Sequence, residues 1–465
     1  MWGYGGDCGD EYQFGVFGCN GLVGADRTPH PALLEVKKGY QPLQIELESA
    51  KPLRLRIRNR YAFRTLDHLL GRWRLTVDGI TVAHGDLPRG QAGPGEDALI
   101  DLEIEPVKRR GFERHLYVEF RLREGTPWAP AGHLVAWEQH ALSGDSLAET
   151  PAIQTLDLSA MTPIAMSQDL RWLTLECEQA LLRFDKESGE LVSLQCGERE
   201  LLAGPLTMNL TRAPIDNDVS LALMAPALRF LTRDPWPNAW QRRRLRSFEI
   251  GRSDDAVVSV VAQYALPLIR TPLKVLYTLF GSGDLVIEAE MVPRRELLRF
   301  GMQFDVPAAY ERLTWFGRGP HETMWDRQQG APVGIYSQTA EAMIEQYVRP
   351  QESGSRTGVR WATLTDRDGE GLLLADEAGT LLSVSAWPFS QDDLMQSPHL
   401  HELPRRDVIT VNVTHRQRGV GGDLPVGVTV HPRCRLTPNR SYLLRFRLRP
   451  FAPGDPLGRE LQWIA

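Results

Sequence analysis

Apolar and polar residues alternate along most of this chain from residue 42 onward, with the two-residue period of β-strands. Residues 43–47 read Leu-Gln-Ile-Glu-Leu, and residues 53–58 read Leu-Arg-Leu-Arg-Ile-Arg. Residues 73–82 predict a hairpin, because Asp78-Gly79 allows the positive φ angles of a two-residue type I′ turn. Further strands are predicted at residues 98–104, 116–122 and 134–142. So many short strands in about a hundred residues are typical of an immunoglobulin-like sandwich.

A second β-rich region runs from residue 169 to residue 465 and contains one predicted helix, at residues 339–348. A single flat sheet of this many strands would curl or split, so the region predicts a large sandwich of two sheets. The strands are expected at residues 173–177, 180–184, 191–195, 201–202, 275–280, 285–292, 381–386, 408–414 and 442–450.

The remaining segments set the domain boundaries that we expect. Residues 1–41 read as a loop followed by a short helix at 31–38, which has Pro at its start and lysines at its end. The first sandwich is assigned to residues 42–145, and a polar, proline-containing linker to residues 146–168. A chain of 465 residues is long enough for two or three domains.

Composition narrows the classes of protein. The formal net charge of -6 and the pI near 6.0 argue against nucleic acid or an anionic membrane as a partner. No stretch approaches the roughly 18 apolar residues of a membrane span, and the first residues do not resemble a secretory signal. The five cysteines are odd in number and form no Cys-x-x-Cys pair, which favours a reducing, cytoplasmic location.

Candidate chemistry is concentrated near the N-terminus. Asp7, Asp10 and Glu11 lie among glycines, where carboxylates can hold a cation or act as acid and base, although Asp and Gly also dominate ordinary turns. The carbonyl of Phe17 and the side chain of Asn20 could face one hard cation, or Asn20 could cap a turn.

Other motifs are open to two interpretations each. His399 and His401 fall on one side of the chain, but no third ligand and no His-Glu-x-x-His motif indicates catalytic zinc. Residues 315–322 combine aromatics with Arg and Gly, which suits either sugar stacking or core packing. Residues 419–423 predict a close backbone approach or a bulge, and residues 211–218 a surface loop. Taken singly, these motifs give no function.

Read together and in order, the motifs resemble the bacterial β-galactosidases of glycoside hydrolase family 2 over essentially the whole chain. Tyr-Gly-Gly-Asp-x-Gly-Asp, then Phe-x-x-Asn-Gly-Leu-Val-x-Ala-Asp-Arg-x-Pro-x-Pro, resembles the final strand of the family's TIM barrel and its exit. Residues 131–133 and 136–137 resemble the end of its second sandwich. Residues 211–218, 315–322 and 419–423 resemble marks of its large C-terminal β-domain.

The resemblance implies a mostly β chain: a TIM-barrel remnant at residues 1–41, an immunoglobulin-like sandwich, and a large galactose-mutarotase-like β-sandwich at residues 169–465. It also implies retaining hydrolysis by two glutamates whose carboxyl groups stand ~5–5.5 Å apart. Both glutamates lie upstream of the matched region, so no catalytic residue is assigned within residues 1–465. The loop at residues 10–20 is expected at the barrel's active-site face.

The resemblance implies binding residues as well. Phe17, through its carbonyl, and Asn20, through its side chain, match the family's sodium ligands, and Asn20 would also contact substrate because that sodium touches the galactosyl 6-hydroxyl. Gln13 falls where some members have an Asn near an accessory magnesium. Val426 stands where a Trp often stacks on the glucose of lactose, and the missing indole removes ~1 kcal/mol or more. Trp325 is an alternative aromatic for that role.

We therefore expect a cytoplasmic β-galactosidase that uses Na⁺ and Mg²⁺, with this chain as its C-terminal fragment or a separately encoded subunit. A fragment is favoured, since a natural boundary falls in a linker rather than inside a core sheet. The isolated chain is expected to be inactive, to need an N-terminal catalytic portion, and to belong to a homo-oligomer in the complete enzyme. The alternative is a non-catalytic carbohydrate-binding or scaffolding β-sandwich protein.

Overall fold

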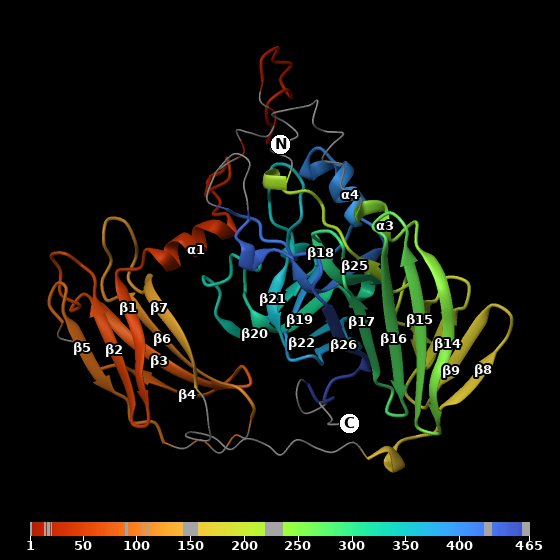
Figure 1. Cartoon of the computed structure of the whole chain (residues 1–465). Helices are drawn as coiled ribbons and strands as arrows, with labels where there is room; N and C mark the ends of the chain where they lie inside the picture. The colour runs from red at the N-terminus through yellow and green to blue at the C-terminus, as the bar shows by residue number, and fades with distance from the viewer. Residues whose placement is uncertain are drawn as a thin grey trace. The chain divides into compact units, whose positions relative to one another are not determined.

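The computed structural model describes residues 2–13, 15, 19, 21–88, 92–105, 107, 109, 111–142, 157–218, 236–422 and 430–457. It divides into two compact units (Figure 1). The first unit comprises Ala32–Gln154 and Gln329–Ile335, and the second comprises Met1–Pro31, Thr155–Gln328 and Tyr336–Ala465. Among the described residues, no helix combines the length and the apolar character that crossing a membrane requires.

The described part of the first unit is a sandwich of two antiparallel sheets that follows helix α1 (Pro31–Gly39). Buried Leu55 and Ile57 from one sheet belong to the same core as Leu75 and Val118 from the other. This confirms the predicted immunoglobulin-like sandwich. One sheet has the order β1-β2-β5, with bounds Leu43–Ala50, Leu53–Asn59 and Asp97–Asp101; the other has the order β4-β3-β6-β7, with bounds Ile80–Asp86, Leu69–Val77, Arg114–Leu122 and Leu134–Leu142.

The β3–β4 turn takes the form that the sequence predicts. Asp78 and Gly79 have φ angles of 48° and 79°, as a type I′ turn requires. The Asp78 carboxylate accepts hydrogen bonds from the backbone N–H groups of Phe112 (3.1 Å) and Glu113 (2.8 Å). The turn is therefore fixed to the segment that leads into β6.

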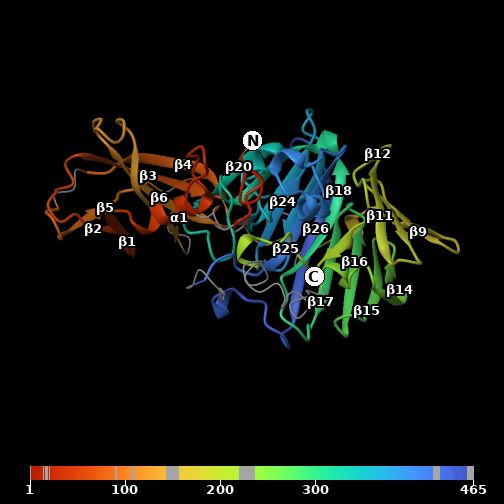
Figure 2. The same cartoon turned by 90° about the horizontal axis from the view of Figure 1, so that it is seen from above.

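The second unit is built on three antiparallel sheets (Figure 2). The largest has the order β14-β15-β16-β17-β26-β23-β22-β19-β20, with bounds Arg244–Asp254, Val257–Leu266, Thr271–Phe280, Leu285–Met291, Tyr442–Phe451, Gly371–Asp376, Trp361–Thr365, Arg312–Arg318 and Val333–Thr339. The second has the order β13-β18-β25-β24-β21, with bounds Thr207–Asn209, Arg299–Pro307, Val408–Gln417, Leu382–Trp387 and Arg356–Val359. The third has the order β12-β11-β10-β9-β8, with bounds Arg199–Glu200, Glu190–Cys196, Leu181–Asp185, Trp172–Glu176 and Ala165–Gln168.

One buried core joins these sheets. Phe304 on β18 and Val413 on β25 belong to the same cluster as Ile287 on β17 and Phe446 on β26, and Phe184 on β10 extends it to the third sheet. Burying each large apolar side chain contributes about 1.5–3 kcal/mol. The large C-terminal β-sandwich is thus confirmed.

The helix predicted over residues 339–348 is wrong. A 3₁₀ turn, η5 (Glu341–Met343), occupies its start, and Ile344 after it is extended (φ −74°, ψ 122°). The backbone N–H of Ala340 donates to the carbonyl of Glu311 at 2.8 Å, so a contact to another segment determines the conformation. The apolar spacing there reflects burial of a turn rather than a helical face.

Two other local predictions also need correction. Residues 165–168, placed in the linker of residues 146–168, form β8 and pair with β9. Residues 201–202, predicted as a strand, follow β12 as irregular backbone, in which the N–H of Leu201 donates to the carbonyl of Leu194 at 2.9 Å. Two short helices that the sequence did not predict are α3 (Trp236–Ala239) and α4 (Gln391–Gln396). Residues 143–156 lie outside the described residues.

Candidate functional site at the N-terminal loop

The N-terminal loop folds against the end of the second unit that carries α4 (Figure 1). Its turns depend on glycine, since Gly6 and Gly9 have φ angles of 100° and 78°. The N–H of Gly5 donates to the carbonyl of Gly15 at 3.1 Å, which closes the neck of the loop. A Cβ at Gly5 would lie 2.9 Å from the nitrogen of Gly15, so this approach needs glycine.

Tyr4 and Asp7 make the contacts between this loop and the segment after α4. The Tyr4 ring stacks on the His399 imidazole, with centroids 5.0 Å apart and an interplanar angle of 22°. Its hydroxyl donates to the carbonyl of Pro398 at 2.8 Å. The Asp7 carboxylate accepts from the N–H of Tyr4 at 2.7 Å and lies 2.8 Å from Nε2 of His399.

His399 lies between two carboxylates. Its Nδ1 is 3.0 Å from Oε1 of Glu402, in the 3₁₀ turn η6 (Leu400–Glu402). The hydrogen bond that His399 donates to Asp7, with a smaller contribution from the one to Glu402, raises the pKa of His399. The same His399 contact lowers the pKa of Asp7. The cluster therefore favours an ionised carboxylate beside an imidazolium.

Cys19, farther along the N-terminal segment, lies near the carboxylate of Asp216. Burial raises the pKa of its thiol, and the Asp216 carboxylate raises it further. Asp216 pairs with Arg349 (3.2 Å) and accepts a hydrogen bond from the amide of Gln351 (3.0 Å).

The exit of the N-terminal segment contacts a buried charged group. The rings of His30 and Tyr347 meet edge to face at 5.3 Å. The hydroxyl of Tyr347 donates to Glu322 at 3.0 Å, Arg327 forms an ion pair with the same carboxylate, and the N–H of Gly354 donates to it at 2.6 Å. Glu322 is fully partnered, which gives it a structural role at this end of the unit.

Most of the predicted binding residues are not located by the structure. Phe17, Asn20 and Val426 lie outside the described residues. Gln13 is exposed, and its side-chain oxygen accepts a hydrogen bond from the N–H of Gly15. No group of three or more His, Cys, Asp or Glu side chains able to hold a metal occurs in the part of the chain that the structure describes.

The structure also locates the aromatic residues for which the sequence left sugar stacking or core packing open. Trp315 is fully buried and its indole N–H donates to the carbonyl of Arg318 at 3.0 Å, so this part of residues 315–322 is core rather than a sugar platform. Trp325 is half-buried, with the guanidinium of Arg416 at 5.3 Å from its ring.

Sequence reasoning missed the pairing of Asp7 with His399, because 392 positions separate them.

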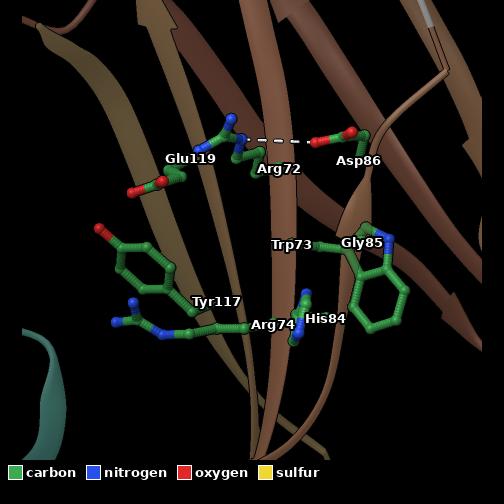
Figure 3. Close-up of a pocket in the computed structure, with 8 residues that line it drawn as sticks. All are labelled: Arg72, Trp73, Arg74, His84, Gly85, Asp86, Tyr117 and Glu119. Carbon is green, nitrogen blue, oxygen red and sulfur yellow. Dashed lines mark ion pairs between the residues drawn. The ribbon is translucent and has the colours of Figure 1, made fainter. Parts of the chain in front are cut away.

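A separate pocket of about 440 Å³ lies on the first unit, over β3, β4 and β6 (Figure 3). The guanidinium of Arg74 lies 4.0 Å from the centre of the Tyr117 ring, and Trp137 on the neighbouring strand β7 stacks with that ring at 5.5 Å. Figure 3 shows the Trp73 indole on the opposite side of β3 from Arg74. The Tyr117 ring is therefore already packed against Arg74 and Trp137. Its lining comprises Arg72, Trp73, Arg74, His84, Gly85, Asp86, Tyr117 and Glu119.

Three family models match the chain in order. The model described as "Glycosyl hydrolases family 2, TIM barrel domain" matches residues 1–45. The model "Beta-galactosidase, domain 4" matches residues 55–143. The model "Beta galactosidase small chain" matches residues 176–448.

Curated relatives match almost all of the chain. The β-galactosidase of Priestia megaterium is 32% identical over 451 residues, which cover 96% of this chain and 42% of the relative. That of Vibrio cholerae is 31% identical over 466 residues, covering 97% and 43%. The chain thus spans less than half the length of these relatives.

Solved structures show a more distant similarity. A galactose 1-epimerase from Lactobacillus acidophilus is 8% identical, with a TM-score of 0.40, over 62% of this chain and 99% of that one. An α-galactosidase from Lactobacillus brevis is 10% identical, with a TM-score of 0.29, over 60% and 39%. This likeness concerns the fold alone.

Proposed function

Because the chain belongs to the β-galactosidase small-chain family, we propose that it is the C-terminal portion of an enzyme that hydrolyses terminal β-D-galactose residues with retention. The observation that carries the proposal is the order of the three family matches, which begins with the end of a TIM barrel and continues through both sandwiches. The share of the relatives that the chain spans, 42% for the Priestia megaterium enzyme, supports a missing N-terminal portion.

The proposed division of labour follows from which residues are present. The two catalytic glutamates belong to the missing portion, where one protonates the leaving oxygen and the other attacks the anomeric carbon. This chain contributes binding groups: the carbonyl of Phe17 and the side chain of Asn20 would hold a sodium ion that orients the galactosyl 6-hydroxyl. The accessory magnesium near Gln13 remains a proposal of the same kind. The isolated chain would therefore bind sugar weakly and not hydrolyse it.

The nature of the leaving group belongs to the same proposal. With Val426 in place of an aromatic residue, stacking on the glucose of lactose would weaken, and β-galactosides with other leaving groups would be hydrolysed as well as lactose. Trp325 remains the aromatic that could replace it. We further propose a cytoplasmic enzyme that forms a homo-oligomer in its complete form.

The test compares this chain alone with the chain after complementation. The 465-residue chain should show no turnover of nitrophenyl β-galactoside. Mixing it with the N-terminal portion of the Priestia megaterium enzyme, up to the region matched here, should produce activity; we call this mixture the complemented enzyme. Activity of the isolated chain would refute the assignment of both glutamates to missing sequence. Failure of two folded portions to complement would favour the scaffolding alternative, and the reading frame upstream of the Met1 codon distinguishes fragment from subunit.

A further inference from the structure

His399 joins two carboxylates that come from distant parts of the chain. Its Nε2 lies 2.8 Å from Asp7 of the N-terminal loop, and its Nδ1 lies 3.0 Å from Glu402 of η6. A neutral imidazole can donate from only one of its nitrogens, whereas an imidazolium donates from both. When His399 is protonated, both of its nitrogens can therefore donate a hydrogen bond to the carboxylate that each one faces.

Tyr4 strengthens the same contact in three further ways. Its ring covers the imidazole at 5.0 Å, and its hydroxyl donates to the carbonyl of Pro398 at 2.8 Å. Its backbone N–H donates to the Asp7 oxygen that also faces His399. The loop is thus held by a ring contact, a neutral hydrogen bond and a charge-assisted hydrogen bond, the last being the strongest kind.

The position of this contact in the chain gives it a consequence for the loop. Gly5, next to Tyr4, closes the loop neck by donating to Gly15. The contacts of Tyr4 and Asp7 with the His399 segment therefore flank the residue that closes the neck of the loop.

We propose that Asp7, His399 and Glu402 form a clasp by which the C-terminal sandwich positions the N-terminal loop for galactose binding. The proposal rests on the function proposed above, which assigns sugar and sodium binding to that loop. His399 is a positioning residue, because it acts through Asp7. Fixing a loop before the ligand arrives removes the cost of ordering it on binding, so the clasp should lower KM and change kcat little.

The charges around His399 determine how the clasp responds to pH. The groups that face the imidazole are the carboxylates of Asp7 and Glu402, the phenol of Tyr4 and the ring of His401 at 5.5 Å. The pKa of His399 is raised. Its contribution to the stability of the clasp is therefore complete below about pH 6.5 and is lost as the pH rises through the raised pKa. The pKa of Asp7 is lowered, so its contribution is lost as pH falls through that lower value.

The first arm of the test uses the 465-residue chain alone. The pKa of His399 is measured by NMR on histidine-labelled protein. Asp7→Asn should lower the pKa of His399 by roughly one unit. An unchanged His399 pKa would show that the clasp does not form.

The second arm uses the complemented enzyme. His399→Ala should raise KM for nitrophenyl β-galactoside about tenfold, equivalent to about 1.4 kcal/mol, with kcat within about twofold. His399→Gln, which can still donate to Asp7, should recover part of the loss. If Asp7→Asn shifts the pKa while KM stays constant in all variants, the positioning role is refuted and the proposed function stands. An inactive unmodified mixture would refute the proposed function, and the positioning role with it, while the pKa still reports whether the clasp forms.

Discussion

Arg299 and Glu352 form an ion pair in the second unit, and their side chains are only 2% and 0% exposed. The guanidinium also donates to the side-chain oxygens of Gln391 (3.2 Å) and Gln417 (2.8 Å). Desolvation of two charges is offset here by their attraction and by these additional hydrogen bonds. The pair is therefore much more sensitive to the loss of one partner than a surface pair is.

Glu352→Ala should destabilise the second unit by about 3–5 kcal/mol, because it leaves the Arg299 charge buried without its partner. The matched control is Glu341→Ala, which breaks the ion pair with Arg405. The side chains of Glu341 and Arg405 are 59% and 47% exposed. That change should cost about 0–1 kcal/mol. Urea unfolding of the full chain measures both, and equal losses would contradict the importance of the buried pair.

Burial, followed by the neighbouring Glu322 carboxylate, raises the pKa of Glu345 to about 7. Because the pKa of Glu345 is raised, its protonated carboxyl contributes fully to the stability of the fold below about pH 4.5. This contribution is lost as the pH rises through about 7. Glu345→Gln should therefore become more stable than the unmodified chain with increasing pH, by about 2–3 kcal/mol between pH 5 and pH 8. Urea unfolding at the two pH values measures the difference, and the exposed Glu311→Gln should show none.

The strands could be predicted from sequence because most of them bury one face. Along β2, for example, Leu53, Leu55 and Ile57 are buried and the arginines between them are not. The helix predicted at residues 339–348 failed because its apolar residues are buried by a short turn held to Glu311, a contact that periodicity does not encode. The pattern of apolar and polar residues identifies which faces are buried. It does not distinguish a helix or strand from an irregular segment that is buried to the same extent.

The candidate site was predictable in part. Its loop could be found because glycines and acids cluster at residues 3–10, and Gly6 and Gly9 do adopt positive φ angles. The partner of Asp7 could not be found, because the pairing with His399 depends on how the second unit folds. The predicted metal residue Gln13 accepts a hydrogen bond from the N–H of Gly15, and its role toward magnesium stays a prediction.

Gly79 tests whether the β3–β4 turn stabilises the first unit. Gly79→Ala should cost at least about 1 kcal/mol, because its φ of 79° is unfavourable for residues with a Cβ. The control is Gly39→Ala at the end of α1, where no atom would contact the added Cβ within 4 Å and helix propensity favours alanine. Hydrogen exchange of the β3 and β4 backbone amides in the full chain measures both variants. Equal protection in the two would contradict the prediction.

Asn20 tests the proposed sodium and galactose site directly. In the complemented enzyme, Asn20→Ala should remove one oxygen ligand, raise the sodium concentration for half-maximal activation about tenfold and weaken galactose inhibition. Hard cations such as sodium accept carboxylate as well as amide oxygens, so Asn20→Asp should retain most of the sodium response. Sodium titrations of nitrophenyl β-galactoside hydrolysis, at constant ionic strength set with a bulky cation, separate specific activation from screening. If the alanine and aspartate variants both respond to sodium as the unmodified enzyme does, Asn20 is not a sodium ligand.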